Sequence, residues 1–327
     1  MAINRVEIND FLVFKGAFEA DFCPGINVLI GGNATGKTTL LKAMFMYCDA
    51  RKMSYEVSDK AGNGRLKVHE AFSMPPYFQY IDAVPESIGN TYDENYNDCN
   101  SKLTVNGFNP SQQFVFIPTN DMLSHSKGFL PLYYERELPF DVTYVDILSK
   151  AGLPVTRNVT PIATKVLNKI KGIIGGEVAY ENDVFYIQRV SGDKMPFSLE
   201  ASGYRKLGLL WKLLRNGLLE SGSILFWDEP ENSLSPEHVP ILVDILLELS
   251  RNGVQIFLAT HSEIFASYCA VNREKGDTVM FTSLYKKGEQ IKANTSDRFD
   301  LLEPNKLTAE IVHLYEKQIV KGLSGNV

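Results

Sequence analysis

The hydrophobic and polar positions of this chain follow a strand-like pattern near the N-terminus and alternate between strands and helices in the C-terminal part. Residues 3–8 alternate between apolar and polar side chains, which is typical of a half-buried strand, and β character continues through residues 11–22. Buried apolar runs that alternate with helical periodicity from residue 198 onward indicate a largely parallel sheet covered on both faces. Strands are predicted at 224–227, 254–259 and from 278, and helices at about 203–219, after Pro236 and after Ser262.

The middle of the chain has a different character. Short strand candidates alternate with polar turns up to about residue 113, and the segment after residue 120 looks mainly helical. We therefore expect one α/β domain over residues 1–327, with an inserted β or irregular segment at about 49–113 and a helical subdomain at about 120–200. The local features predicted here are strands at 66–70 and 77–81, an acidic loop at 91–98, a buried strand at 114–118 and a hairpin at 178–187.

A glycine-rich segment follows the apolar run 26–30 and precedes a helical pattern. It fits the phosphate-loop pattern G-x-x-x-x-G-K-[ST], in which glycines allow successive N–H groups to turn onto phosphate oxygens. Lys37 would reach the β- and γ-phosphates, and Thr38 would offer its hydroxyl to Mg²⁺. We therefore predict ATP and Mg²⁺ as cofactors. The predicted nucleotide-binding residues of this loop are Gly31, Gly32, Asn33, Ala34, Thr35, Gly36, Lys37, Thr38 and Thr39.

Two adjacent carboxylates, Asp228 and Glu229, follow the predicted strand 224–227. Ligands of open α/β sheets bind at the carboxyl ends of the strands, where both side chains would emerge. We expect Asp228 to help hold Mg²⁺ opposite Thr38, and Glu229 to polarise the water that attacks the γ-phosphate. An apolar run followed by two acidic residues is a weak signal alone, and the upstream phosphate loop makes it a strong one.

Two further elements complete the predicted site. His261 follows the strand 254–259, where its side chain could hydrogen-bond the γ-phosphate. Ser202 and Gly203 stand just before a helix, whose N-terminus can bind an anion through its N–H groups and dipole. Each has a simpler explanation, a structural histidine and a helix cap by Ser202. The order of the four elements along the chain favours the functional interpretation.

These motifs together resemble the ATP-binding-cassette (ABC) ATPase superfamily. The corresponding segments are a Walker A motif at 31–38, a signature at 200–206, a Walker B motif at 224–229, a D-loop near 232–234 and an H-loop at His261. Residues 8–31 resemble the non-transporter branch, which includes ATPases similar to structural-maintenance-of-chromosomes (SMC) proteins. Residues 116–124 and 299–317 resemble stand-alone ATPases of the overcoming-lysogenization-defect (OLD) type, found in bacterial phage-defence and toxin operons.

The chain departs from the superfamily at two motifs. The usual signature Leu-Ser-Gly-Gly-Gln is replaced by residues 200–204, Glu-Ala-Ser-Gly-Tyr, with Ala201 in place of the serine that contacts the γ-phosphate. Ser202 or backbone N–H groups would have to substitute, which affects the expected rate of hydrolysis more than ATP binding. The Q-loop glutamine has no convincing equivalent. Its candidates are Gln79, Gln112, Gln113 and Asp121.

The resemblance implies an ATPase in which each nucleotide is sandwiched between the phosphate loop of one subunit and the signature of another. Because one chain carries one of each motif, we expect a homodimer with two composite sites. The resemblance and the motifs assign catalytic roles to Glu229, His261 and Lys37. ATP would join the subunits, and hydrolysis would release them.

Composition restricts the environment and the partners. The net charge of −6 argues against constitutive, purely electrostatic binding of nucleic acid. The four cysteines lie far apart without metal-ligand spacing, which favours reduced thiols. No apolar run reaches the roughly 18 residues that a membrane span requires, and no signal peptide is apparent. We therefore expect a cytoplasmic protein with no membrane partner.

We consider three functions. The first is a regulatory ATPase that controls a separately encoded effector, such as a nuclease or toxin, in defence against phage. The second is a DNA-repair or recombination ATPase that contacts nucleic acid directly through the basic segment 157–171, with Lys165, Lys169 and Lys171. A solvated helix face is the simpler explanation of these lysines. The third, the nucleotide-binding subunit of a transporter, is opposed by the altered signature.

Overall fold

The computed structural model describes residues 1–61, 102–136, 138, 140–157 and 159–323. Several expectations therefore lie outside the described residues. They are the strands predicted at 66–70 and 77–81, the acidic loop at 91–98, and the Q-loop candidate Gln79. One of the four cysteines expected to be reduced, Cys99, also lies outside the described residues.

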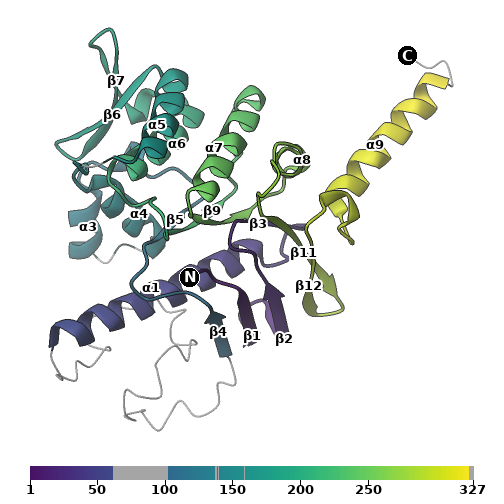
Figure 1. Cartoon of the computed structure of the whole chain (residues 1–327). Coiled ribbons are helices and arrows are strands. Elements are labelled where there is room, and N and C mark those ends of the chain that lie inside the picture. Colours follow the sequence, from purple (N-terminus) through teal and green to yellow (C-terminus); the bar gives the residue numbers. More distant parts are fainter. Residues whose placement is uncertain (62–101, 137, 139, 158, 324–327) are drawn as a thin grey trace.

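A six-stranded sheet forms the centre of the molecule (Figure 1). Its strands lie in the order β12-β11-β3-β10-β9-β5, and every neighbouring pair is parallel except β11 and β12. This arrangement confirms the predicted α/β fold with a mainly parallel sheet. The strands are β3 (Ile26–Ile30), β5 (Phe114–Ile117), β9 (Ile224–Asp228), β10 (Gln255–Ala259), β11 (Val279–Lys287) and β12 (Gln290–Ser296).

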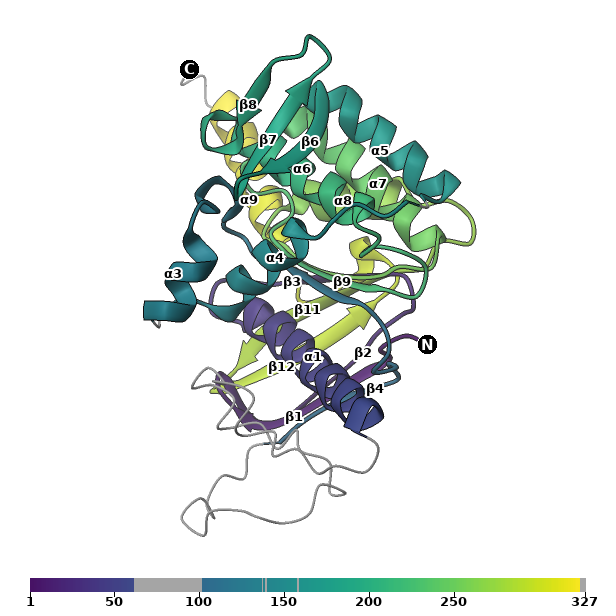
Figure 2. The ribbon, with the colours of Figure 1, turned by 90° about the vertical axis from the view of Figure 1, so that its left-hand side faces the viewer.

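Helix α1 (Lys37–Ala61) covers one face of this sheet together with a small antiparallel sheet (Figure 2). The small sheet has the strand order β2-β1-β4. Alternate side chains of β9 contribute to the two hydrophobic cores, with Phe226 on the α1 side and Trp227 on the opposite side. The small sheet contains β1 (Arg5–Phe11), β2 (Phe14–Asp21) and β4 (Lys102–Asn106).

The opposite face of the central sheet is covered by helices, so its central strands are buried on both sides. A second antiparallel sheet, β6-β7-β8, packs beside these helices, and its first two strands confirm the hairpin predicted at 178–187. The helices are α3 (Phe129–Arg136), α4 (Val142–Gly152), α5 (Pro161–Ile174), α6 (Ser202–Arg215), α7 (Val239–Arg251) and α8 (Glu263–Val271). The strands are β6 (Gly176–Glu181), β7 (Val184–Arg189) and β8 (Lys194–Pro196).

The remaining elements are short, apart from the last helix. Helix α9 (Lys306–Leu323) begins near the phosphate loop and extends away from the rest of the chain (Figure 1). Within the described part of the chain, no helix combines the length and apolar character needed to cross a membrane. Among the described residues, four 3₁₀ helices connect the larger elements: η2 (Leu123–His125), η3 (Phe197–Leu199), η4 (Pro236–His238) and η5 (Phe299–Leu301).

Two boundaries differ from the sequence-based expectation. The predicted β or irregular segment does not begin at residue 49, because α1 continues to Ala61. Residues 37–61 contain neither glycine nor proline, so no helix breaker occurs before Gly62. Helix α6 ends at Arg215 rather than near residue 219. The backbone leaves the helix at Gly217, which has a φ of 73°.

The buried Gln255 side chain links the first residues of the chain to the beginning of β10. Its Oε1 accepts a hydrogen bond from the Ile3 N–H (2.8 Å), and its Nε2 donates to the carbonyl oxygens of Ile3 (2.7 Å) and Cys23 (2.8 Å). These three hydrogen bonds all go to backbone groups, so this polar side chain is satisfied in the core.

Candidate active site

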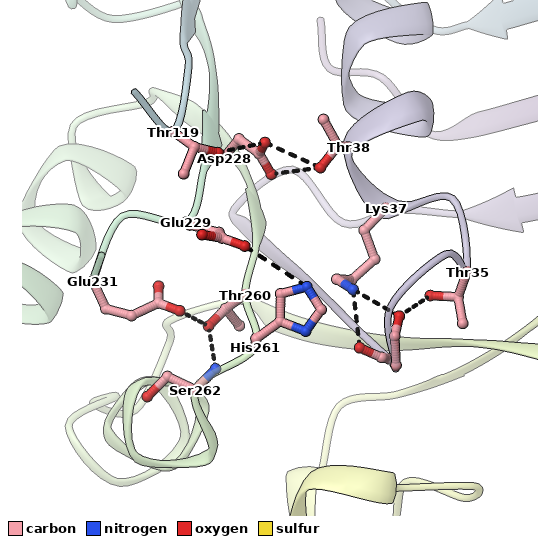
Figure 3. Close-up of polar contacts among 12 residues, drawn as sticks. Thr35, Lys37, Thr38, Thr119, Asp228, Glu229, Glu231, Thr260, His261 and Ser262 are labelled. Atoms are coloured by element: carbon pink, nitrogen blue, oxygen red, sulfur yellow. Dashed lines mark hydrogen bonds and ion pairs between the residues drawn. The ribbon is translucent and has the colours of Figure 1, made fainter. Parts of the chain in front are cut away.

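Three neighbouring strands of the central sheet bring the predicted motifs together. Strands β3, β10 and β9 are adjacent and parallel, with Ala259 paired to both Leu29 and Asp228. The glycine-rich loop, His261 and Asp228 therefore emerge at the same edge of the sheet (Figure 3). This is the place where ligands bind in open α/β sheets.

The glycine-rich loop has the backbone geometry that a phosphate loop requires. Gly31 and Gly36 have φ values of 147° and 87°, which disfavour any residue with a Cβ. A Cβ on Gly31 would lie 2.3 Å from the carbonyl oxygen of Leu284 on β11. Thr35 Oγ1 donates a hydrogen bond to the Gly32 carbonyl at 2.9 Å, and α1 begins at Lys37 as predicted.

The Lys37 side chain is almost fully buried against this loop. Its Nζ donates to the carbonyl oxygens of Gly31 (2.9 Å) and Gly32 (3.1 Å). Burial lowers the pKa of Lys37 to about 8, although the nearby carboxylates of Asp228 and Glu229 act in the opposite direction. An anion that enters the loop would therefore meet an ammonium group that has little contact with water.

A cluster of oxygen atoms marks the predicted Mg²⁺ side of the site. Thr38 Oγ1 lies 3.0 Å from both carboxylate oxygens of Asp228, and Thr119 Oγ1 donates to Asp228 Oδ2 at 2.7 Å. Hydroxyl and carboxylate oxygens are the ligand types that Mg²⁺ prefers. The residues present therefore fit the metal, and Thr38 and Asp228 would hold it.

Sequence reasoning did not identify Thr119. It follows Pro118 directly after β5, so its side chain also emerges at the carboxyl edge of the sheet. The signal that could have revealed it is a polar residue after a buried strand of the same parallel sheet.

Two of the Q-loop candidates, Gln112 and Gln113, lie elsewhere. Gln112 Nε2 donates to the carbonyls of Met1 and Gly222, and the Gln113 carbonyl accepts from Ile224 at the beginning of β9. Both glutamines are therefore at the opposite edge of the sheet. The hypothesis that either of them is the Q-loop residue is wrong. Asp121 forms an ion pair with Arg205, with 2.6 Å between Oδ2 and Nε in an orientation unsuited to a hydrogen bond.

Glu229 and His261 face each other, with 3.7 Å between Glu229 Oε1 and His261 Nε2 (Figure 3). Both side chains are about one-third exposed. Glu229 has a φ of 50°, an uncommon conformation for a residue other than glycine. Burial, followed by the charge of Lys37, lowers the pKa of His261, so its neutral form is favoured at pH 7. A neutral imidazole can either donate or accept a hydrogen bond beside the carboxylate.

Behind this pair, Glu231 contacts the loop that carries His261. Thr260 Oγ1 donates to Glu231 Oε1 at 2.5 Å and accepts from the Ser262 N–H at 2.9 Å. Burial raises the pKa of Glu231. This connection between the loops after β9 and β10 was not foreseen, since Glu231 is one of several acidic residues after the strand.

The signature residues lie on α6 and contact the D-loop of the same chain. Ser202 Oγ is 3.4 Å from the Ser233 carbonyl oxygen, and a Cβ on Gly203 would lie 3.1 Å from that oxygen. The N-cap of α6 is Ala201 without a side-chain hydrogen bond, so the alternative of a helix cap by Ser202 is wrong. Within the described part of the chain, no hydrogen bond joins Ser202 to residues 31–39.

The basic segment on α5 is partly neutralised by its neighbours. Lys165 Nζ is 2.8 Å from Glu248 Oε1, and Lys171 Nζ is 2.6 Å from Glu177 Oε1. These ion pairs weaken the electrostatic attraction for phosphates that the alternative of direct DNA contact requires.

Comparison with known proteins connects this site to ATPases. The profile of a family described as "AAA domain, putative AbiEii toxin, Type IV TA system" matches residues 120–267, and that of another AAA domain family matches residues 5–105. The structure is similar to an SMC head bound to the C-terminal winged-helix domain of ScpA, with a TM-score of 0.52, 13% identity, and coverage of 90% of this chain and 98% of that one.

The relatives identified by sequence include a transport protein and a repair protein. The glutamine transport ATP-binding protein GlnQ of Geobacillus stearothermophilus is 25% identical over 133 residues, which are 39% of this chain and 48% of that protein. The DNA replication and repair protein RecF of Oenococcus oeni is 45% identical over 51 residues, 16% of this chain and 13% of RecF. The chain thus covers about half of the first relative and a smaller part of the second.

Proposed function

We propose that this chain is an Mg²⁺-dependent ATP switch that dimerises around the nucleotide, because two of its segments match AAA domain families and its fold is similar to that of an SMC head. The observation that carries the proposal is the placement of two half-sites on one chain. Lys37, Asp228 and Glu229 gather at the phosphate loop, whereas Ser202 and Gly203 lie on the D-loop side without a hydrogen bond to that loop. A second copy would supply the missing half.

The residues of the first half-site have distinct roles in this proposal. Lys37 and the N–H groups of residues 31–39 bind the phosphates, and Thr38 and Asp228 hold Mg²⁺. When bound, Mg²⁺ neutralises charge on the phosphate oxygens. Glu229 orients the attacking water and accepts its proton, while His261 contacts the γ-phosphate.

The second half-site supplies anion-binding groups rather than a reacting side chain. The N-terminus of α6 presents Ser202 and Gly203 next to Ala201, which has no hydroxyl. Ser202 and backbone N–H groups of one copy would bind the γ-phosphate held by the other. The loss of the γ-phosphate on hydrolysis would remove this link between subunits.

We further propose that the switch controls a separately encoded effector, of nuclease or toxin type, in defence against phage. The matched profile, whose description names a toxin and a type IV TA system, supports this proposal.

Co-purification with the products of the neighbouring genes tests the effector proposal. A tagged wild-type chain should retain an effector in an ATP-dependent manner, and a Lys37→Ala chain should not. Failure of any neighbouring product to co-elute under either condition would contradict the proposal.

Direct action on DNA is the second candidate, because 51 residues of the chain are 45% identical to RecF. It predicts that duplex DNA stimulates ATP turnover and that binding weakens steeply with salt. Replacing Lys165, Lys169 and Lys171 with glutamine should abolish this binding. Turnover that is independent of DNA would favour the effector instead.

A further inference from the structure

The buried side chain of Lys206 joins the signature helix to the loop that carries Glu229. Lys206 lies in the first turns of α6, and its Nζ donates to the carbonyl oxygens of Glu229 at 2.8 Å and Asn232 at 2.9 Å. Only 8% of the residue is exposed. A lysine is almost never buried to this extent unless its charge is compensated.

The backbone that Lys206 contacts is in an unfavourable conformation. Glu229 has a positive φ, and its carbonyl oxygen also accepts a hydrogen bond from the Asn232 N–H at 3.1 Å. Residues 229–232 therefore form a tight turn, and the lysine bridges the carbonyl groups at its two ends. Strained backbone persists where surrounding contacts fix it, and Lys206 provides two such contacts.

The charges of four carboxylates act on this ammonium group. Glu231, Glu229, Asp121 and Asp228 all favour its charged form, in opposition to burial. The lysine thus contributes positive charge as well as hydrogen bonds to the turn. A neutral side chain of similar length would leave two buried carbonyl oxygens without this donor. It would also remove the positive charge that offsets the repulsion between the carboxylates.

We propose that Lys206 is a positioning residue for Glu229 of its own chain, although it lies on the helix whose N-terminus serves the site of the second copy. Its ammonium group contacts backbone carbonyl oxygens of the turn after β9. By fixing the carbonyl of Glu229, it directs the carboxylate toward His261 and the phosphate loop. This inference rests on the proposed ATP sandwich, and it assigns two tasks to α6: binding in one composite site and alignment in the other.

Single substitutions provide the first test. Lys206→Met should lower kcat by about 10²-fold, since misplacement of a reacting group by about 1 Å costs that much, while KM and the affinity for a fluorescent ATP analogue stay within about twofold. Lys206→Arg, which keeps charge and donors, should restore part of kcat. The matched control is Lys212→Met, which removes another buried lysine of α6 and should keep the wild-type kcat.

Mixed dimers of differently tagged chains provide the decisive test. In each, one chain carries Lys37→Ala, so that a single composite site binds ATP. Placing Lys206→Met in the chain that retains Lys37 should slow turnover by the same factor as the single substitution described above. Placing it in the Lys37→Ala chain should leave the rate of the wild-type/Lys37→Ala dimer unchanged, because that chain contributes only its signature.

The outcomes separate the possibilities. Equal slowing in both arrangements, or unchanged kcat in Lys206→Met, would overturn the proposal. If the methionine variant does not fold, as judged by thermal unfolding, Lys206→Gln replaces it in the same mixed dimers. If Glu229→Gln chains fail to dimerise with ATP, the ATP sandwich itself is wrong, and this result is distinguishable from a failure of the role assigned to Lys206.

Discussion

The Lys37 ammonium group is bound by the carbonyl oxygen of Gly31, 2.9 Å away, so the side chain is held by the loop that would present it to a phosphate. Its pKa is lowered to about 8 by burial, and bound phosphates would raise this pKa because they favour the charged form. ATP binding should therefore take up a proton between pH 8 and 9, and affinity should fall as the pH rises through 8. Calorimetry in two buffers with different ionisation enthalpies measures this uptake.

Lys37→Arg serves as the control for proton uptake. Arginine keeps its charge over the whole range, so its ATP binding should show no uptake at Lys37 and a weaker dependence on pH. If the arginine variant takes up the same fraction of a proton as the wild type, another group is responsible.

Glu229→Gln should trap an ATP-bound dimer. The amide keeps the size of the side chain but cannot accept the proton of the attacking water, and the loss of a general base lowers rates by about 10²–10⁴-fold. Size-exclusion chromatography with saturating ATP and Mg²⁺ should show a dimer, and Lys37→Ala should remain monomeric. A monomeric Glu229→Gln chain under these conditions would refute the ATP sandwich.

Thr119→Val should weaken the response to Mg²⁺. The hydroxyl of Thr119 orients the Asp228 carboxylate at 2.7 Å, and the loss of such supporting hydrogen bonds typically costs about 10–100-fold in metal affinity. The measurement is the Mg²⁺ concentration at which half of the Glu229→Gln chains dimerise with ATP. Thr119→Ser keeps the hydroxyl and should behave as the wild type, whereas an equal shift in both variants would show that the methyl group matters instead.

Gly31→Ala should destabilise the protein by about 2 kcal/mol, as expected for a residue forced into a sparsely populated conformation. The added Cβ would also meet the Leu284 carbonyl oxygen at 2.3 Å. Gly32→Ala is the neighbouring control, because a Cβ at Gly32 lies 3.9 Å from Lys306 Cδ and has ordinary space. Urea denaturation compares the two free energies of unfolding. Equal values would indicate that β11 moves to accommodate the substitution at Gly31.

The parts of the fold that follow local pattern could be predicted from the sequence. The apolar runs at 26–30 and 224–227 are buried strands because they carry no polar side chain apart from Asn27, and the helix after Gly36 begins at Lys37 as its motif requires. The end of α6 could not be placed in this way. Apolar residues continue beyond Arg215, and the positive φ of Gly217 decided the boundary.

The candidate site was predictable where its residues belong to motifs and not where they depend on tertiary contact. Thr119 and Asp228 meet only because β5 and β9 are neighbours, a pairing that periodicity does not reveal. Lys206 looks in sequence like one of several basic residues on a helix. Its role follows from burial against the turn after β9, which no local pattern encodes.

The position of β3 has a consequence for synthesis of the chain. This strand, which delivers the glycine-rich loop, pairs on one side with residues 256–259 of β10 and on the other with residues 279–283 of β11. A ribosome therefore synthesises the loop well before it reaches either flanking strand. We therefore expect a growing chain to bind ATP only after both strands that flank β3 have been synthesised and paired with it.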